Sequence, residues 1–200
     1  TRSRIFPKYN FFFTWHNEMR SHLFKLYKNE INLDDIYVTG NIGDSNIGLN
    51  ILKKKISINK KLNKYFIEKY FLSDLPFRLH KHLNKFANSS IDVSDGLFAD
   101  LKKLINKQKF GYNIYVDKIP LSRNLSLYLK NNKKNFLKFI SKGDDYQVLF
   151  TSSKKNRYYI KKIAKRINIK ITLIGLITNQ FKQRLLFSHG KQIKPMNCEG

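Results

Sequence analysis

The chain has 200 residues, of which 42% are hydrophobic and 14% aromatic, and this composition is typical of a folded protein rather than a disordered one. Its 39 Lys and Arg residues against 14 Asp and Glu give a net charge of +25, which would attract nucleic-acid phosphates. The single cysteine, Cys198, excludes an internal disulfide framework and fits a reducing compartment, so we expect the cytoplasm. No early apolar stretch approaches the roughly 18 residues of a membrane span, so we expect no membrane association.

The hydrophobic pattern alternates between strand and helix periods along the chain. We expect strands near residues 36–39, 90–93, 113–117, 147–151 and 171–177, and a further strand and turn over 184–191. We expect helices near residues 44–54, 62–71, 76–86, 96–107, 133–140 and 155–167. This alternation predicts a mixed sheet covered by helices, with one soft domain boundary near residues 34–35.

The lysines are spread through every predicted helix instead of forming one tract. In the helix expected near 155–167 they lie opposite an apolar stripe that includes Ile160, Ile163 and Ile167, which is the pattern of a solvated helix face. The bias toward Lys, Ile and Asn is typical of a genome poor in G and C. We therefore do not expect nucleic acid as a partner. A basic nucleic-acid-binding protein is kept as the alternative of another class, and it predicts salt-sensitive retention on DNA.

The most informative local feature lies where the hydrophobic period switches from two to helical spacing, across residues 94–96. Asp92 and Ser94 would share one face of the strand, and Asp95 would begin the next helix. Free backbone N–H groups at that helix start favour an anion, and Gly96 lets the anion approach closely. Because carboxylates repel an anion, the arrangement predicts Mg²⁺ between protein and phosphate. The alternative is an ordinary helix cap that needs no ligand.

Two further turns repeat this pattern. Gly143, Asp144 and Asp145 precede a run of residues that reads as a buried strand. The glycine-rich turn over residues 40–45 follows the strand near 36–39 and opens a helix. Each turn alone is weak, since Gly-Asp turns are ordinary loop chemistry.

Three runs of sequence resemble the thiamine-monophosphate kinase family. They are IYVTGNIGDSNIGL (36–49), ANSSIDVSDGLFADL (87–101) and KGDDYQVLFT (142–151). Pro120 and the run ITLIGLIT (171–178) support the resemblance, which covers roughly residues 34–195.

The resemblance implies a kinase that uses ATP to phosphorylate thiamine monophosphate to thiamine diphosphate. It implies an α+β fold of the superfamily that includes aminoimidazole ribonucleotide synthetase and selenophosphate synthetase, and a homodimer at full length. Asp92 and Asp95 match the family's magnesium ligands, and Ser94 matches its ATP-contacting serine. Asp144 falls where the family carries an acidic residue associated with the thiamine substrate.

The chain also departs from the family pattern. Lys142 stands in place of a glycine, and Gln147 stands in place of a glutamate. Residues 1–33 are expected to be a remnant of the N-terminal ATP-binding domain, although 3–30 match poorly, and residues 34–200 the C-terminal domain. The resemblance therefore implies a fragment truncated at both ends and inactive alone. A catalytically dead remnant of the family is the alternative reading within the same resemblance.

Overall fold

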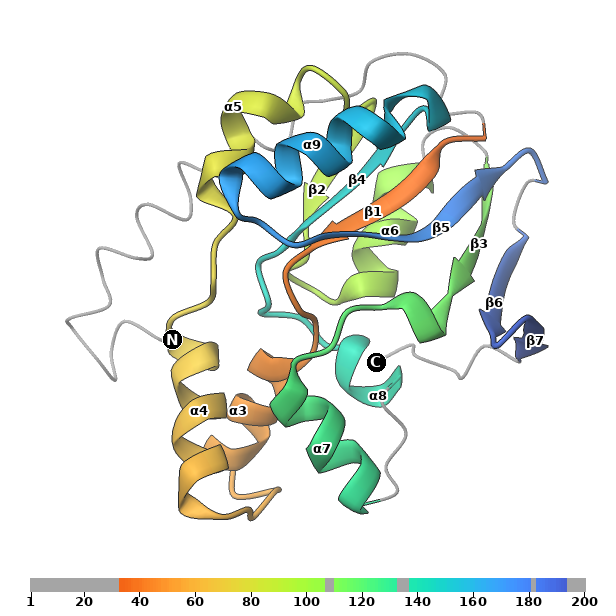
Figure 1. The fold of residues 1–200 in the computed structure, drawn as a ribbon. Coiled ribbons are helices and arrows are strands. Elements are labelled where there is room, and N and C mark those ends of the chain that lie inside the picture. Colours follow the sequence, from red (N-terminus) through yellow and green to blue (C-terminus); the bar gives the residue numbers. More distant parts are fainter. Residues whose placement is uncertain (1–32, 107–109, 133–136, 181–182, 194–200) are drawn as a thin grey trace.

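The computed structural model describes residues 33–106, 110–132, 137–180 and 183–193 (Figure 1). The expected domain remnant over residues 1–33 therefore lies almost entirely outside the described residues. The first part of the helix expected near 133–140 lies outside them as well. Among the described residues, no helix is both long and apolar enough to cross a bilayer.

Within the described residues, seven strands form one sheet in the order β2-β4-β1-β5-β3-β6-β7. Their bounds are β1 Asp35–Thr39, β2 Ser89–Asp92, β3 Gly111–Tyr115, β4 Val148–Ser152, β5 Ile171–Thr178, β6 Arg184–Ser188 and β7 Lys191–Ile193. Neighbouring strands are antiparallel except β3 and β6, which are parallel. The expectation of a mixed sheet is confirmed.

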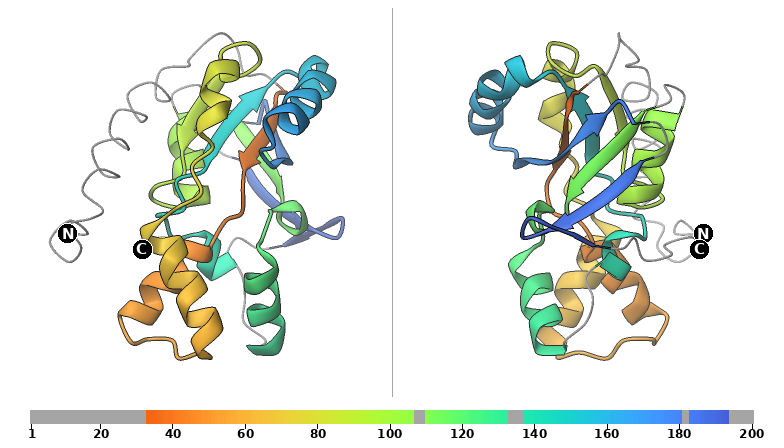
Figure 2. Two further views of the ribbon diagram at one scale, coloured as in Figure 1. Left: turned by 60° about the vertical axis from the view of Figure 1, so that its left-hand side comes forward. Right: turned by 90° about the vertical axis from the view of Figure 1, so that its right-hand side faces the viewer.

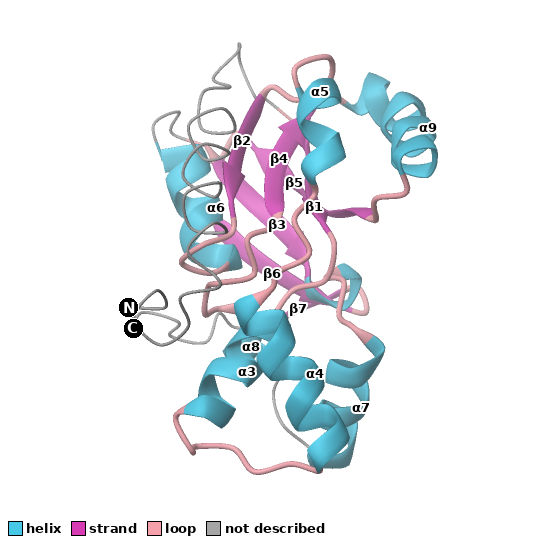
Figure 3. Cartoon of the chain, turned by 90° about the vertical axis from the view of Figure 1, so that its left-hand side faces the viewer, coloured by secondary structure: helices cyan, strands magenta, loops and turns pink. Residues whose placement is uncertain are grey.

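The helices lie on both faces of the sheet and below one end of it (Figures 1 and 3). Their bounds are α3 Asp44–Leu52, α4 Lys60–Phe71, α5 His80–Leu83, α6 Leu97–Asn106, α7 Arg123–Asn132, α8 Leu137–Ile140 and α9 Arg157–Ile167. Short 3₁₀ turns cover Phe77–Leu79, Val116–Lys118 and Lys154–Asn156. Helices α5 and α9 cover one face of the sheet, α6 covers the other, and α3, α4, α7 and α8 gather below (Figure 2).

Strand β1 shows why the sheet is covered on both sides. Ile36 and Val38 pack in the cluster that includes α6 residues, whereas Tyr37 packs in the cluster that includes α9 residues. Side chains alternate between the faces of a strand, so an unbroken apolar run places apolar groups on both faces. Tyr37 also stacks on Phe150 of the neighbouring strand β4, with ring centroids 5.1 Å apart.

Helix α9 confirms the expected division between an apolar stripe and a basic face. Its buried side chains are Ile160, Ile163 and Ile167. Its exposed positions hold lysines and arginines together with Tyr158. Arg157, at the start of the helix, pairs with the buried Asp35, and the other basic side chains extend into solvent.

Some expected elements are wrong in extent or were missed. The single helix expected near 76–86 is a 3₁₀ turn followed by the short helix α5. The strand expected near 113–117 ends at Tyr115 and continues as a 3₁₀ turn. Helix α7 was not expected; it is held by its apolar side chains Leu125, Tyr128 and Leu129, which pack with α3 and α4 residues below the sheet. Packing of that kind depends on partners that lie far away in sequence.

Candidate functional site

The two acidic turns that follow strand β2 and precede strand β4 lie against each other. Strand β2 pairs with β4 in antiparallel register, with Asp92 opposite Val148. Beyond the strands the pairing continues, because the Tyr146 N–H donates to the Val93 carbonyl at 2.9 Å and the Asp144 N–H donates to the Ser94 carbonyl at 3.0 Å. The structure thus brings Ser94 and Asp144, two of the expected site residues, into direct backbone contact.

Gly143 explains how closely these turns approach. A Cβ atom built on Gly143 would lie 1.7 Å from the Ser94 carbonyl oxygen, far inside any real contact. No other residue type fits at this position without moving one of the two turns. The glycine of the GDDY run is therefore required by contact with the SDG run.

The third turn, over residues 40–45, is joined to the turn of Asp145 by long-range hydrogen bonds. The Gly43 N–H donates to Oδ2 of Asp145 at 2.7 Å, and the Ser45 N–H donates to Oδ1 at 3.3 Å. Gly43 has a φ of 97°, which few residues other than glycine adopt. All three turns predicted as separate weak signals meet at one end of the sheet.

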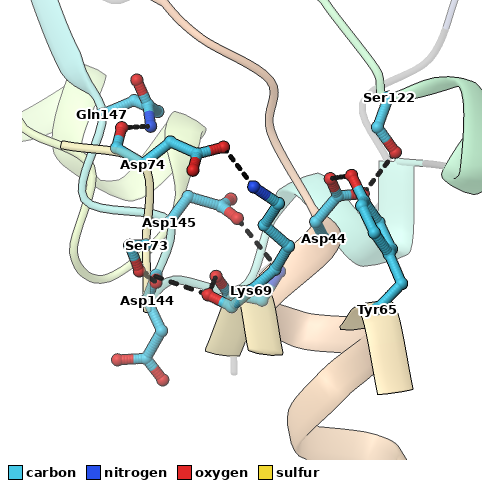
Figure 4. Close-up of polar contacts among 10 residues, drawn as sticks. Asp44, Tyr65, Lys69, Ser73, Asp74, Ser122, Asp144, Asp145 and Gln147 are labelled. Atoms are coloured by element: carbon cyan, nitrogen blue, oxygen red, sulfur yellow. Dashed lines mark hydrogen bonds and ion pairs between the residues drawn. The ribbon is translucent and has the colours of Figure 1, made fainter. Parts of the chain in front are cut away.

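Gln147, which directly precedes strand β4, links this end of the sheet to the end of strand β1 and to the loop after helix α4. Its Oε1 accepts a hydrogen bond from Thr39 Oγ1 at 2.7 Å, and its Nε2 donates to the Asp74 carbonyl at 2.7 Å (Figure 4). The side chain is buried, so it needs both partners. Gln147 stands where the family pattern has a glutamate, and an amide offers both the donor and the acceptor that these contacts use, whereas an ionised carboxylate only accepts.

Lys142, the other departure from the family pattern, causes no backbone strain. The described residues with positive φ in this turn are Asp144 at 77° and Tyr146 at 53°. Lys142 is not among them and its side chain is exposed. The turn therefore does not need a glycine at the position that Lys142 occupies.

The backbone N–H groups of the turn over residues 94–96 are not free, contrary to the expectation. Those of Ser94, Asp95 and Gly96 donate to Oδ2 of Asp100 at 2.9, 2.9 and 3.2 Å. Asp100 is fully buried. An internal carboxylate therefore accepts the N–H groups that were expected to meet an anionic ligand, and it comes from inside helix α6 instead of from a capping Ser or Asp side chain of the turn.

Sequence reasoning did not single out Asp100, although a signal was present. Asp100 lies on the same helical face as Leu97, Leu101 and Leu104, all buried in the core. A carboxylate on an apolar stripe must be paired in a folded protein. Its position one turn after the SDG run pointed to the N–H groups of that run.

Asp92, Ser94 and Asp95 do gather at the end of strand β2, but in different surroundings. The Asp92 side chain is buried, Ser94 is half-buried, and the Asp95 side chain is 64% exposed. Asp95 precedes the first residue of α6 by two positions, so it does not begin the helix as expected. Its carboxylate forms an ion pair with Lys103 Nζ.

Lys103 bridges the exposed and the buried carboxylate. Besides its contact with Asp95, Nζ donates to Oδ1 of Asp100 at 2.8 Å. Burial lowers the pKa of Lys103, but its hydrogen bonds to Asp100 and Asp95 outweigh that effect and raise it above its usual value. Lys103 therefore carries its charge at neutral pH.

A second group of acidic side chains lies below the sheet, between α3, α4 and the turn before β4 (Figure 4). Asp44 is buried and accepts hydrogen bonds from Ser122 Oγ at 2.7 Å and from the Tyr65 hydroxyl at 2.9 Å. Lys69 Nζ contacts the carboxylate of Asp74. Sequence reasoning had not placed Tyr65, Lys69 or Asp74 at the site, because they come from a helix and loop that no motif marks.

Burial dominates the ionisation of this group. It raises the pKa of Asp44 above its usual value, against the hydrogen bonds from Ser122 and Tyr65. It raises the pKa of Asp145 to about 8, although the N–H groups of Gly43 and Ser45 act in the opposite direction. Asp145 is therefore largely uncharged at neutral pH.

Asp144, the expected substrate residue, faces a different way from its neighbour Asp145. Its carboxylate turns away from Asp74, Lys69 and Asp145 (Figure 4). One carboxylate oxygen accepts a hydrogen bond from the Tyr146 hydroxyl at 3.2 Å, and the Asp144 carbonyl accepts one from Ser73 Oγ at 3.3 Å. Consecutive aspartates thus serve different purposes: Asp145 braces the fold, while Asp144 reaches outward.

Within the described residues, no group of three or more His, Cys, Asp or Glu side chains could hold a metal ion by itself. Asp92 and Asp95 nevertheless suit Mg²⁺, because this ion usually takes only one or two carboxylates and completes its shell with water and substrate phosphates. The ammonium group of Lys103 also shows that Asp95 already holds a cation.

Comparisons with known proteins agree with the three runs of sequence. No family model matches the chain. The thiamine-monophosphate kinase of Buchnera aphidicola subsp. Acyrthosiphon pisum (strain APS) is 40% identical over 173 residues, which are 84% of this chain and 52% of that protein. The thiamine-monophosphate kinase of Escherichia coli (strain K12) is 30% identical over 162 residues, covering 80% and 49%. This chain spans about half the length of the curated relatives it matches.

Solved structures give the same result. The structure of AaThiL complexed with AMPPCP and TMP superposes with a TM-score of 0.68 at 28% identity, over 84% of this chain and 52% of that one. Escherichia coli HypE, a hydrogenase maturation protein, superposes with a TM-score of 0.65 at 13% identity, over 85% and 51%, and so shows the fold alone.

The fold and the three joined turns thus define the chain as an α+β domain of the aminoimidazole ribonucleotide synthetase-like class, as expected. Within that class, its sequence is homologous to the C-terminal part of thiamine-monophosphate kinases.

Proposed function

We propose that this chain supplies the nucleotide-side and substrate-side turns of a kinase that uses ATP to phosphorylate thiamine monophosphate to thiamine diphosphate. The observation that carries the proposal is the direct contact between the turn of Ser94 and the turn of Asp144. In the family that this chain resembles, the first turn contacts ATP and metal, and the second contacts the thiamine substrate. Two substrates that exchange a phosphoryl group must meet, and these turns do.

The reaction needs no general base from the protein. The attacking group is a phosphate oxygen of thiamine monophosphate, and a phosphate monoester has a second pKa of about 6, so that oxygen is already anionic near neutral pH. The work of the protein is then to hold two repelling anions in line. Fixed turns do this better than mobile ones, because the geometry is set before the substrates bind.

The chain's own carboxylates fix those turns. Asp100 holds the N–H groups of residues 94–96, and Asp145 holds those of Gly43 and Ser45. Asp92 and Asp95 would hold Mg²⁺, which when bound would offset the negative charge of the phosphates. Ser94 would contact ATP, and Asp144, whose carboxylate turns outward from the braced group, would contact thiamine monophosphate (Figure 4).

The wider setting follows from the resemblance as well. We assign the described fold to a C-terminal domain that begins near residue 34, with residues 1–33 as part of the preceding domain. We also propose a homodimer at full length and a cytoplasmic location, which a single cysteine fits.

The test is formation of thiamine diphosphate from thiamine monophosphate and MgATP by the polypeptide that the complete reading frame around these residues encodes. We expect Asp95→Asn to lower the rate by about 100-fold or more, the scale of losing a key electrostatic group in a transition state. Its folding stability should change by less than about 1 kcal/mol, because the Asp95 side chain is 64% exposed.

Asp117→Asn is the matched control. Asp117 is an exposed aspartate in the 3₁₀ turn after β3, outside the three turns. Its substitution makes the same chemical change and should leave the rate unaltered. An active wild-type protein whose Asp95→Asn variant keeps its full rate would refute the role of this turn. A folded, complete protein without any activity would favour the catalytically dead remnant.

A further inference from the structure

Lys103 forms an ion pair with Asp95, one of the two carboxylates that would bind a metal ion under the proposed function. Its Nζ contacts Asp95 on one side and Asp100 on the other. It comes from the second turn of α6, three residues after Asp100 and eight after Asp95. The ammonium group of Lys103 is therefore a cation that the chain itself supplies at the site proposed for a metal ion.

The ammonium group is held there by a rigid partner. Asp100 is fully buried, and its Oδ2 is fixed by the three N–H groups of residues 94–96. Its Oδ1 remains for Lys103, at 2.8 Å. The Asp95 side chain, by contrast, is 64% exposed, and among the described residues it forms an ion pair with Lys103. The contact with Asp100 is therefore the fixed end of the bridge, and the contact with Asp95 is the end that can open.

We propose that Lys103 is a positioning residue that competes with divalent metal for Asp95. This inference rests on the proposed function, since it takes Asp95 as a metal ligand. A divalent ion that binds Asp95 must displace the ammonium group, which then stays on Asp100 close to the ion. Lys103 thus orients Asp95 before metal arrives and weakens the binding of metal that arrives alone.

The same arrangement couples metal to nucleotide. When metal arrives with the phosphates of a nucleotide, their negative charge gives the displaced ammonium group a new partner. The competition therefore lowers affinity for free metal more than affinity for metal bound to nucleotide. Removal of Lys103 should make the two affinities more alike, which is a change in the coupling between two ligands.

Two variants of Lys103 and one of its neighbour separate these effects. Lys103→Met removes the charge and keeps the length of the side chain, while Lys103→Arg keeps a cation that can bridge the same two carboxylates. Lys102 is exposed and forms no ion pair with any residue that the structure describes, so Lys102→Met removes one charge from the same helix without opening Asp95.

The measurement is the affinity of the 200-residue chain for Mn²⁺, determined with and without AMPPCP. The electron paramagnetic resonance signal reports the concentration of the free ion. Without nucleotide, Lys103→Met should bind Mn²⁺ about two- to fivefold more tightly than wild type, the scale of an exposed ion pair. With AMPPCP the gain should be smaller. Lys103→Arg and Lys102→Met should remain within about twofold of wild type, because neither opens Asp95.

Equal Mn²⁺ affinity in Lys103→Met and Lys102→Met would overturn the inference, because the effect would then be that of overall charge. Failure of Lys103→Met to bind Mn²⁺ at all would also overturn it, because Lys103 would not be what holds metal back. Asp95→Asn keeps these results distinct from the proposed function. If it abolishes activity while Lys103→Met leaves Mn²⁺ affinity unaltered, the kinase proposal stands and only the competition fails.

Discussion

Two of the three turns are each braced by a carboxylate that accepts backbone N–H groups, yet the two braces differ in almost every other respect. Asp100 lies four to six residues after the N–H groups of its turn, on the helix that the turn opens. Asp145 lies 100 and 102 residues from Ser45 and Gly43, across the fold. Asp100 uses one oxygen for three N–H groups and gives the other to Lys103, whereas Asp145 uses one oxygen for each N–H group.

The difference teaches how charge is divided at this end of the sheet. The Asp100 brace includes an ion pair with Lys103, whose pKa is raised by its hydrogen bonds to Asp100 and Asp95. Asp145 forms no ion pair within the described part of the chain, and burial raises the pKa of its carboxyl group to about 8. The ionic brace lies on the turn proposed to bind metal and ATP, and the nearly neutral one ties down the turn between strand β1 and helix α3.

Removal of the Asp100 side chain should have the largest effect. Asp100→Ala leaves three N–H groups without their acceptor and leaves Lys103 with Asp95 alone, and we expect a loss of about 4 kcal/mol in the free energy of unfolding, measured by urea titration. Asp100→Asn should lose about half as much, because its amide oxygen can still accept the three N–H groups. Equal losses in both variants would contradict the asymmetric use of the two oxygens.

The Asp145 brace should give a characteristic pH dependence. Its pKa is about 8 in the folded protein against an ordinary value of 3.8, so the fold binds the proton more tightly than the unfolded chain. Its contribution to stability is therefore complete below about pH 4 and is lost as pH rises through 8. We expect the free energy of unfolding of the wild type to fall by about 1 kcal/mol per pH unit between pH 5 and 8 because of Asp145, and Asp145→Asn to abolish this fall.

The measurement for Asp145 is urea unfolding of wild type and Asp145→Asn at several pH values. The variant should be less stable at pH 5, since an amide cannot accept from both N–H groups, and the gap should close toward pH 8. Asp44 has a raised pKa as well and gives both proteins the same residual slope. Parallel curves for the two proteins would show that Asp145 titrates as an ordinary carboxyl.

Gln147→Glu should have the smallest of the three effects, although it restores the residue that the family carries. The glutamate cannot donate to the Asp74 carbonyl, and the change buries a carboxylate beside a carbonyl oxygen. We expect a loss of about 2 kcal/mol at pH 7 by urea titration. Gln192→Glu, on an exposed residue of strand β7, is the matched control and should change stability by less than about 0.5 kcal/mol. A gain in stability for Gln147→Glu would mean that the loop around Asp74 rearranges to suit the family residue.

The sequence predicted those parts of the fold that depend on local pattern. The change of hydrophobic period across residues 94–96 located the junction of β2 and α6 to within one residue. The apolar stripe of α9 predicted which of its faces is buried. The three runs of sequence named the family because their glycine and aspartate spacing is specific, and the comparisons confirm it.

The sequence did not predict which atoms those motifs use. It left the N–H groups of residues 94–96 available to a ligand, although Asp100 takes them. It assigned no role to Lys69, Asp74 or Lys103, which carry no motif. The roles of Asp92, Ser94, Asp95 and Asp144 stay predictions, since the structure places these residues without showing what they bind.

By itself, then, the sequence determined the order and type of most elements, the three turns and the family, because hydrophobic period and glycine spacing act over a few residues. Only the tertiary structure decided that position 143 must be a glycine because Ser94 lies against it, that Asp145 braces a turn 100 residues away, and that Lys103 pairs with Asp95. These are contacts between side chains and distant backbone, and a buried polar group takes its partner from whatever the packed fold brings within reach.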